Sequence, residues 1–378
     1  MPSINQFLSP GYDRARVAAA MQAAGLDAAL LTSPENVYYT TGYTTLPSAG
    51  NPILHMLRTR LPFFSFVTKD GHVTLFCWDF STLGMEFGAD AVIGFNTYAE
   101  ALQLLGAFLE NNVPPGTRLG LESVCPRFAL SIVDKNAGGA TLVDVDPVLD
   151  EVRLIKSPAE IAYLKRGVEI IEQTCEELYG LLRIGMGRNE LTREAKWRLM
   201  KNGAEGISHL TFCFDQANPE FDIDERLDPD HLVTLDLGAI YKGYCSDNRR
   251  YAYAGTPPGE LIETYGKMVE IIDGVGEAMK PGVSYGELWD LALDLFAERR
   301  LEPAGIINKT GHNIGLETEE RWLDNDRNAF VREGMVINIE MYTHVTTGSH
   351  IGDEETYIIG KNGSTRVSNL PRIIRQIS

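Results

Sequence analysis

The chain has 378 residues, of which 44% are hydrophobic and 23% charged, and its formal net charge is −18. Its length predicts two domains, and its negative charge disfavours nucleic acid and anionic membranes as partners. No apolar run is long enough to cross a bilayer, no secretion signal opens the chain, and the five cysteines form no CxxC pair. We therefore expect a cytoplasmic protein with reduced thiols.

The first 150 residues alternate helical and strand patterns. Residues 16–33 (RVAAAMQAAGLDAALLTS) predict an amphipathic helix that ends at Gly25 and an apolar strand through Leu31. Residues 63–78 (FFSFVTKDGHVTLFCW) predict two strands joined by a turn at Asp70-Gly71. Another helix is expected at AEALQLLGAFLENN, with short strands at GTRLGLE and ATLVDVDP. This alternation predicts an α/β domain.

The pattern changes near residue 150. Ser157-Pro158 predicts the start of a long amphipathic helix, with proline at its first position. We place the boundary by residues 152 to 157, which gives an amino-terminal domain at 1–152 and a second domain at 153–378. The second domain contains helical patterns at 188–202 and 258–279 and several strand runs. The whole chain is therefore expected to be an α+β protein.

Two aspartates flank a predicted hairpin in LDLGAIYKGYCSDNRR. If Lys242-Gly243 is a two-residue turn that pairs Tyr241 with Tyr244, then Gly238 lies opposite Asp247 and Asp236 lies opposite Arg249. Asp236 and Asp247 would then share one face as diagonal neighbours, within reach of a common cation. The alternative is that Asp236 caps a strand end and that Asp247 pairs with Arg249 or Arg250.

Further metal-ligating residue types follow in the second domain. Glu340 lies in the apolar strand of GMVINIEMYTH, and His312 lies in GHNIGLETEERW. Asp353, Glu354 and Glu355 precede the apolar run TYII. Any of the three could face inward, although an acidic cluster at a strand start is usually solvated. Two aspartates, one histidine and two glutamates are a ligand set suited to two divalent ions, which activate a bridging water.

In order and spacing, these segments resemble the pita-bread metallopeptidase superfamily of prolidase, aminopeptidase P, methionine aminopeptidase and creatinase. AAGLDAALLTSPENVYYTTGY looks like the creatinase-type amino-terminal domain, and RLIKSPAEIAYLKRGVEI looks like the junction helix. LDLGAIYKGYCSDNRR, GHNIGLE, INIE and DEETYII are similar to the segments that carry the ligands. The resemblance implies a creatinase-type amino-terminal domain, a pita-bread catalytic domain and a homodimer.

The resemblance also implies roles for individual residues. Asp236 would chelate one metal ion, Asp247 and Glu354 would bridge both ions, and His312 and Glu340 would complete the second site. The sequence does not choose among manganese, zinc, iron and cobalt.

The chain departs from the prolidase pattern at its accessory residues. Glu319 and Asn308 stand where relatives have histidines, QANPEF (216–221) lacks a third histidine, and Gly352 replaces a common arginine. Glu319 is therefore a candidate general base or cation-binding group. His350, four residues before Glu354, is the second candidate catalytic residue. His209 and His344 are further candidates, and the alternative for all three histidines is surface exposure.

These features predict a dinuclear metal-dependent hydrolase that uses a metal-bridging hydroxide on a small amide or carboxylate substrate, cationic or non-peptide in character. One alternative is an Xaa-Pro dipeptidase or aminopeptidase. A second is a metal-dependent lyase of the dimethylsulfoniopropionate-cleaving type, which also lacks the accessory histidines and which TEERW loosely resembles. A third is a non-catalytic pita-bread binding protein, which metal content would distinguish from the enzymes.

Overall fold

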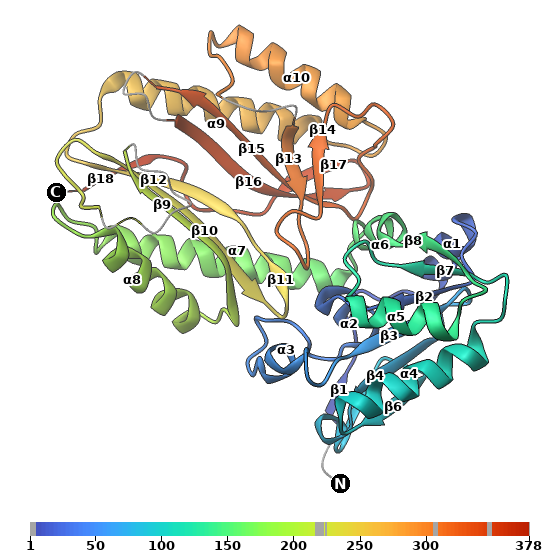
Figure 1. The fold of residues 1–378 in the computed structure, drawn as a ribbon. Helices are drawn as coiled ribbons and strands as arrows, with labels where there is room; N and C mark the ends of the chain where they lie inside the picture. Colours follow the sequence, from blue (N-terminus) through green and yellow to red (C-terminus); the bar gives the residue numbers. More distant parts are fainter. Residues whose placement is uncertain (1–4, 216–222, 224, 305–308, 346–349, 378) are drawn as a thin grey trace. The chain divides into compact units, whose positions relative to one another are not determined.

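The computed structural model describes residues 5–215, 223, 225–304, 309–345 and 350–377. The chain divides between Arg153 and Leu154 into two compact units (Figure 1). Among the described residues, no helix has both the length and the apolar character needed to cross a membrane.

The first unit is an α/β domain, as the alternating pattern predicts. Its elements are β1 Asn5–Phe7, α1 Arg14–Ala23, β2 Ala28–Leu31, α2 Pro34–Thr41, α3 Ile53–Leu57, β3 Phe64–Thr68, β4 Val73–Trp78, the 3-10 helix η1 Asp79–Thr82, β5 Met85–Phe87, β6 Ala91–Phe95, α4 Tyr98–Asn112, β7 Arg118–Leu121, α5 Arg127–Asn136, β8 Thr141–Asp144 and α6 Asp146–Arg153. Six strands form one mixed sheet in the order β6-β4-β3-β2-β7-β8, and β1 pairs with β5.

The second unit is built on one ten-stranded sheet. Its elements are α7 Pro158–Tyr179, α8 Arg188–Lys201, β9 Gly206–Phe214, β10 Leu232–Tyr241, β11 Tyr244–Cys245, β12 Asn248–Ala254, α9 Gly259–Ala278, α10 Tyr285–Glu298, β13 Lys309–Asn313, β14 Arg321–Asp324, β15 Val336–His344, β16 His350–Gly360, β17 Gly363–Arg366 and β18 Ile374–Ile377. The sheet order is β11-β10-β12-β16-β15-β13-β14, with β9 on β10, β17 on β16 and β18 on β12.

Capping residues explain where two of these helices begin. Ser157 Oγ accepts from Glu160 N at 3.2 Å, and Glu160 Oε2 accepts from Ser157 N at 2.6 Å, so α7 starts with a capping box at the predicted position. Ser284 and Glu287 form the same box at the start of α10. The helical patterns named from the sequence omit α10, although its capping box is legible there.

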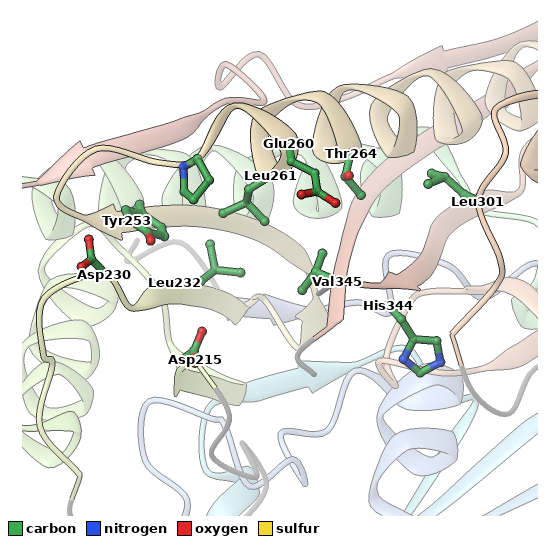
Figure 2. Close-up of a pocket in the computed structure, with 11 residues that line it drawn as sticks. Asp215, Asp230, Leu232, Tyr253, Glu260, Leu261, Thr264, Leu301, His344 and Val345 are labelled. Atoms are coloured by element: carbon green, nitrogen blue, oxygen red, sulfur yellow. The ribbon is translucent and has the colours of Figure 1, made fainter. Parts of the chain in front are cut away.

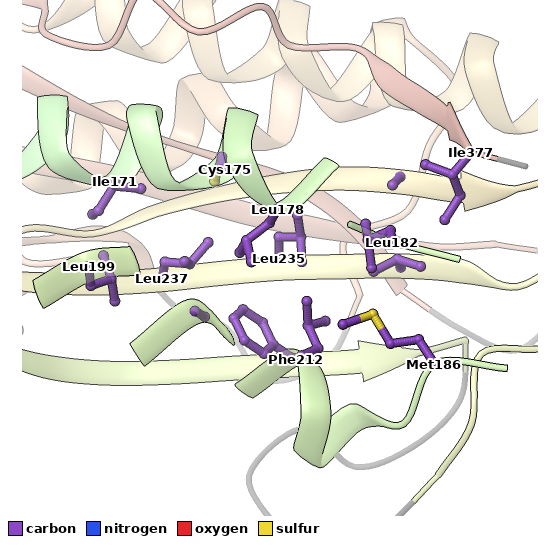
Figure 3. Packing of buried hydrophobic residues seen from close by; sticks show 14 of the residues in the cluster. Ile171, Cys175, Leu178, Leu182, Met186, Leu199, Phe212, Leu235, Leu237 and Ile377 are labelled. Atoms are coloured by element: carbon purple, nitrogen blue, oxygen red, sulfur yellow. The ribbon is translucent and has the colours of Figure 1, made fainter. Parts of the chain in front are cut away.

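The helices pack on two separate parts of the sheet. Helices α7 and α8 cover β9, β10 and β12, and Figure 3 shows Cys175, Leu178, Leu235 and Leu237 in this core. Helices α9 and α10 pack against strands that include β15 and β16. Because side chains alternate along a strand, Asp236, which lies between Leu235 and Leu237, faces away from its helix layer.

The hairpin has most of the predicted register. Tyr241 pairs with Tyr244 and Asp236 pairs with Arg249, as expected. Lys242 and Gly243 both have positive φ, 52° and 82°, as a two-residue type I′ turn requires. The third predicted pair, Gly238 with Asp247, falls in the gap between β11 and β12 and forms no ladder pair.

Candidate metal centre

Four charged residues form one row across four neighbouring strands. Asp236 on β10 lies opposite Arg249 on β12, Arg249 lies opposite Glu354 on β16, and Glu354 lies opposite Glu340 on β15. Directly paired residues share a face of a sheet, so all four side chains project from the same side. The strand register therefore brings together three of the predicted ligands and one arginine.

His312 joins this row through Asn338. The two residues are paired between β13 and β15, and His312 is buried. Asn338 Nδ2 donates to Glu354 Oε1 at 2.6 Å and lies 3.4 Å from His312 Nε2. Asn338 thus holds one oxygen of Glu354 and leaves the other, Oε2, free to face a ligand.

Two overlapping groups of side chains are spaced to hold metal ions. One consists of His209, Asp236 and Asp247, and the other of Asp247, His312 and Glu354; within each group the ligand atoms lie within 4.8 Å of one another. Asp247 belongs to both groups. One carboxylate in two ligand sets is the arrangement expected when two ions lie side by side.

Unpaired oxygens in this cluster fit a bound cation. Glu354 Oε2 is buried and accepts no hydrogen bond from any described residue, and Asp247 Oδ1, which is also buried, lies 3.0 Å from His209 Nε2. A buried carboxylate oxygen without a donor is costly, and a divalent ion would satisfy it. Burial, together with the charges of Asp247 and Asp236, raises the pKa of Glu354 well above its usual range.

Two basic side chains reach the same carboxylates. Arg249 forms an ion pair with Asp236, and its Nε lies 3.9 Å from Glu354 Oε2. Lys309 Nζ lies 3.4 Å from Glu340 Oε1. Burial alone would raise the pKa of Asp236, but Arg249 and His209 outweigh it and lower that pKa.

His209 is the site residue that the sequence indicates least clearly. Its Nε2 lies 3.1 Å from Asp236 Oδ1 and 3.0 Å from Asp247 Oδ1. Burial alone would lower the pKa of His209, but Asp247 and Asp236 raise it well above the usual range. The expected alternative of simple surface exposure does not hold, because the side chain is only 24% exposed.

Gly238 makes room for this histidine. A Cβ at position 238 would lie 1.8 Å from Ser208 Oγ and 2.4 Å from His209 Nδ1. We expect Gly238→Ala to destabilise the protein by about 1–3 kcal/mol through overpacking and to displace His209, which weakens metal binding. Denaturant unfolding and metal titration would measure both effects.

The matched control is Gly266→Ala on α9, where an added Cβ meets nothing within 4 Å. It should raise stability by about 0.5–1 kcal/mol, since alanine is the better helix former. Equal responses of the two variants would contradict the proposed crowding at His209.

The structure separates the two predicted catalytic residues. Glu319 lies at the surface in the turn after β13. Partial burial of its carboxyl group raises the pKa of Glu319, while the nearby His312 and Lys309 oppose the rise. His350 is exposed at the start of β16 and packs against His344, with ring centroids 4.8 Å apart. Four strand residues place it about 13 Å from Glu354. His350 therefore lies outside the cluster, and its catalytic role stays a prediction.

Other acids near the motifs are structural. Glu320 Oε2 pairs with Lys156 Nζ at 2.5 Å, and both side chains are buried. All of Asp353, Glu354 and Glu355 are buried inside β16 rather than solvated at its start. Asp353 and Glu355, the neighbours of Glu354 in the chain, point to the other face of the sheet. There Asp353 forms an ion pair with Arg372, and Glu355 forms one with Arg250. Asn308 and the QANPEF segment lie outside the described residues.

A cavity of about 190 Å³ lies elsewhere in the unit (Figure 2). Asp230, Tyr253, Glu260 and His344 are among its lining residues, and no member of the two ligand groups is. His344 is four residues beyond Glu340 on β15, so this cavity is separate from the carboxylate row.

Comparison with known proteins identifies the family. Residues 162–369, more than half of the chain, match the sequence model of metallopeptidase family M24. The chain belongs to this family. Residues 14–155 match the creatinase/prolidase N-terminal domain. The predicted architecture, a creatinase-type domain followed by a pita-bread domain, is thereby confirmed, and so is the prediction of a metal-dependent hydrolase.

Similar M24 proteins include an Xaa-Pro dipeptidase of Pyrococcus horikoshii, which is 28% identical over 93% of this chain and 95% of the relative. The crystal structure of the prolidase from that organism has a TM-score of 0.79 at 25% identity and covers 95% of this chain and 98% of its own. A prolidase structure from Thermococcus sibiricus has a TM-score of 0.82 and covers 96% of this chain and 98% of its own. At 20% identity, this likeness shows the fold alone. These relatives do not support a non-peptide substrate; the dipeptidase alternative fits them better.

Proposed function

We propose that this M24 protein is an Xaa-Pro dipeptidase that cleaves dipeptides ending in proline and uses two divalent metal ions. One observation carries the proposal: two ligand groups share Asp247 in a chain whose relative is named an Xaa-Pro dipeptidase. Manganese, zinc, iron and cobalt all suit a mixed oxygen and nitrogen ligand set.

The cluster supplies ligands for both ions. The residues that would hold them are His209, Asp236, Asp247, His312, Glu340 and Glu354. Bound there, the ions would polarise the peptide carbonyl and lower the pKa of water. Asn338 would orient Glu354 by its 2.6 Å hydrogen bond, and Tyr342 would orient Glu340, to whose Oε2 its hydroxyl donates at 2.6 Å. Fixed carboxylates of this kind hold metals more tightly than mobile ones.

Glu319 is the proposed proton carrier. Burial raises the pKa of this carboxyl, so it is protonated at a higher pH than an ordinary glutamate and is better suited to donate to the leaving nitrogen. We expect Glu319→Gln to lower kcat roughly 10²-fold with metal content unchanged. Steady-state kinetics on Ala-Pro would measure this loss. Glu317→Gln, an exposed neighbour, is the matched control, and equal kcat values for the two variants would remove Glu319 from the mechanism.

The activity itself is tested with protein stripped of metal and reloaded with each candidate ion. Ala-Pro should be cleaved only by the loaded protein, and Ala-Ala should be cleaved much more slowly. Two bound ions per chain with no hydrolysis of Ala-Pro would overturn the dipeptidase assignment. Hydrolysis that persists in the stripped protein would overturn the metal requirement.

A further inference from the structure

Arg249 places a partly exposed, positively charged side chain inside the carboxylate row. It lies between Asp236 and Glu354 in the strand register, and its side chain is 12% exposed. The next residue, Arg250, points to the other face and is fully buried. Of the two neighbouring arginines, Arg249 is therefore the one whose side chain is partly open to solvent.

Tyr342 and Gly352 hold Arg249 in place. The guanidinium carbon lies 4.4 Å from the centroid of the Tyr342 ring, within cation–π range. Tyr342 is paired with Gly352, where an added Cβ would lie 2.3 Å from the ring. The absence of a side chain at position 352 thus makes room for the ring that carries Arg249. Arg249 Nε is buried and has no acceptor among the described residues.

The net charge of the cluster around Arg249 would change from negative to positive when two divalent ions bind. Four ionised carboxylates, those of Asp236, Asp247, Glu340 and Glu354, would be balanced by two divalent ions. The charges of Arg249 and Lys309 would then remain, a net excess of two positive charges. A partly desolvated pair of cations attracts an anion, and a guanidinium forms a fork that matches a carboxylate.

We propose that Arg249 is the residue that binds the free carboxylate of the substrate. The inference rests on the proposed dipeptidase function and deepens it. It restricts the substrates to peptides whose carboxyl-terminal residue, next to the cleaved bond, has a free and ionised carboxyl group. Arg249 would leave Asp236 when a metal ion takes that carboxylate and would turn its fork to the substrate.

The test is calorimetric binding of L-proline, the expected product, and of L-prolinamide, which lacks the negative charge, to the metal-loaded protein. We expect wild type to bind proline at least about tenfold more tightly than prolinamide. Arg249→Gln should weaken proline binding roughly 10- to 100-fold and leave prolinamide within about twofold. Arg249→Lys keeps the charge but loses the fork and should lie between the two.

Lys309→Gln is the matched control, because it removes one positive charge from the same cluster. If Arg249 is the anchor, Arg249→Gln weakens proline binding more than Lys309→Gln does. Metal content by mass spectrometry should remain two ions per chain in Arg249→Gln. If Arg249→Gln loses metal, the proline affinities of wild type and Arg249→Lys are compared instead to test whether Arg249 binds the carboxylate.

Three outcomes would overturn the inference. They are equal binding of proline and prolinamide by wild type, binding of neither, and a proline affinity that the Arg249 variants do not change. Hydrolysis of Ala-Pro is read separately. If Ala-Pro is hydrolysed but proline binding does not depend on Arg249, the dipeptidase proposal stands and the proposed role of Arg249 fails. If proline binding depends on Arg249 but Ala-Pro is not hydrolysed, the role of Arg249 stands and the dipeptidase proposal fails.

Discussion

Asp247→Asn is expected to abolish stable binding of both metal ions and to lower kcat/KM for Ala-Pro by roughly 10³-fold or more. Asp247 is the residue common to the two ligand groups, so its loss damages both sites at once. Asparagine offers one neutral oxygen where the site needs a charged carboxylate with two. Loss of a residue that merely supports a ligand already costs about 10- to 100-fold, and loss of a shared ligand should cost more.

The stability of the Asp247→Asn variant shows whether its lost activity comes from lost metal binding or from misfolding. Asp247 lies beside other acids, whose repulsion its substitution relieves, and its Oδ1 lies 3.0 Å from His209 Nε2, an ion pair that the substitution weakens, so metal-free Asp247→Asn should stay folded with a stability close to that of metal-free wild type. Wild type should gain thermal stability when divalent metal is added, because only the folded state offers the site. The variant should not gain.

Metal content, the metal-induced rise in Tm and hydrolysis of Ala-Pro are the measurements. Asp294→Asn, an exposed acid on α10, is the control and should match wild type in all three. Two tightly bound ions in Asp247→Asn would show that Asp247 is not a ligand.

Local pattern accounts for the parts of the site that the sequence predicts well. The turn at Lys242-Gly243 fixes the hairpin register, and the register aligns Asp236 with Arg249. A two-residue turn determines its flanking pairs because the strands are adjacent in the chain. Glu340 stands out for a similar reason, as an acid in apolar strand sequence.

Contacts between distant segments account for what the sequence does not predict. His209 reaches Asp236 only because β9 pairs with β10, and nothing in GISHLTFCF marks that pairing. The sequence predicts Arg249 opposite Asp236 or paired with Asp247, but not its position opposite Glu354. That position depends on the β12–β16 contact, which joins residues over a hundred positions apart. The same contact buries Glu355, which isolated sequence would leave in solvent.

That contact also predicts the largest stability effect in the second unit. Arg250 is fully buried and donates from Nη2 to Glu355 Oε1 at 2.6 Å and to Ser368 Oγ at 2.7 Å. Arg250→Met would leave the buried Glu355 carboxylate without its directly bonded cation, with Arg372 as the remaining partner at 3.9 Å from Nε to Oε1. We expect a loss of about 3–5 kcal/mol in the free energy of unfolding, measured by guanidinium titration of the metal-free protein.

Two companion variants show whether the unpaired charge is the cause. Adding Glu355→Gln to Arg250→Met removes the stranded carboxylate, so the double variant should lose less stability than the single one. Arg249→Gln also breaks an ion pair, but divalent metal can replace the guanidinium beside Asp236 and should restore its stability. Metal should not rescue Arg250→Met to the same extent, because Arg250 faces the opposite side of the sheet. If metal rescued both variants equally, the two neighbouring arginines would share one role, and the division between a substrate-facing and a core-facing arginine would be wrong.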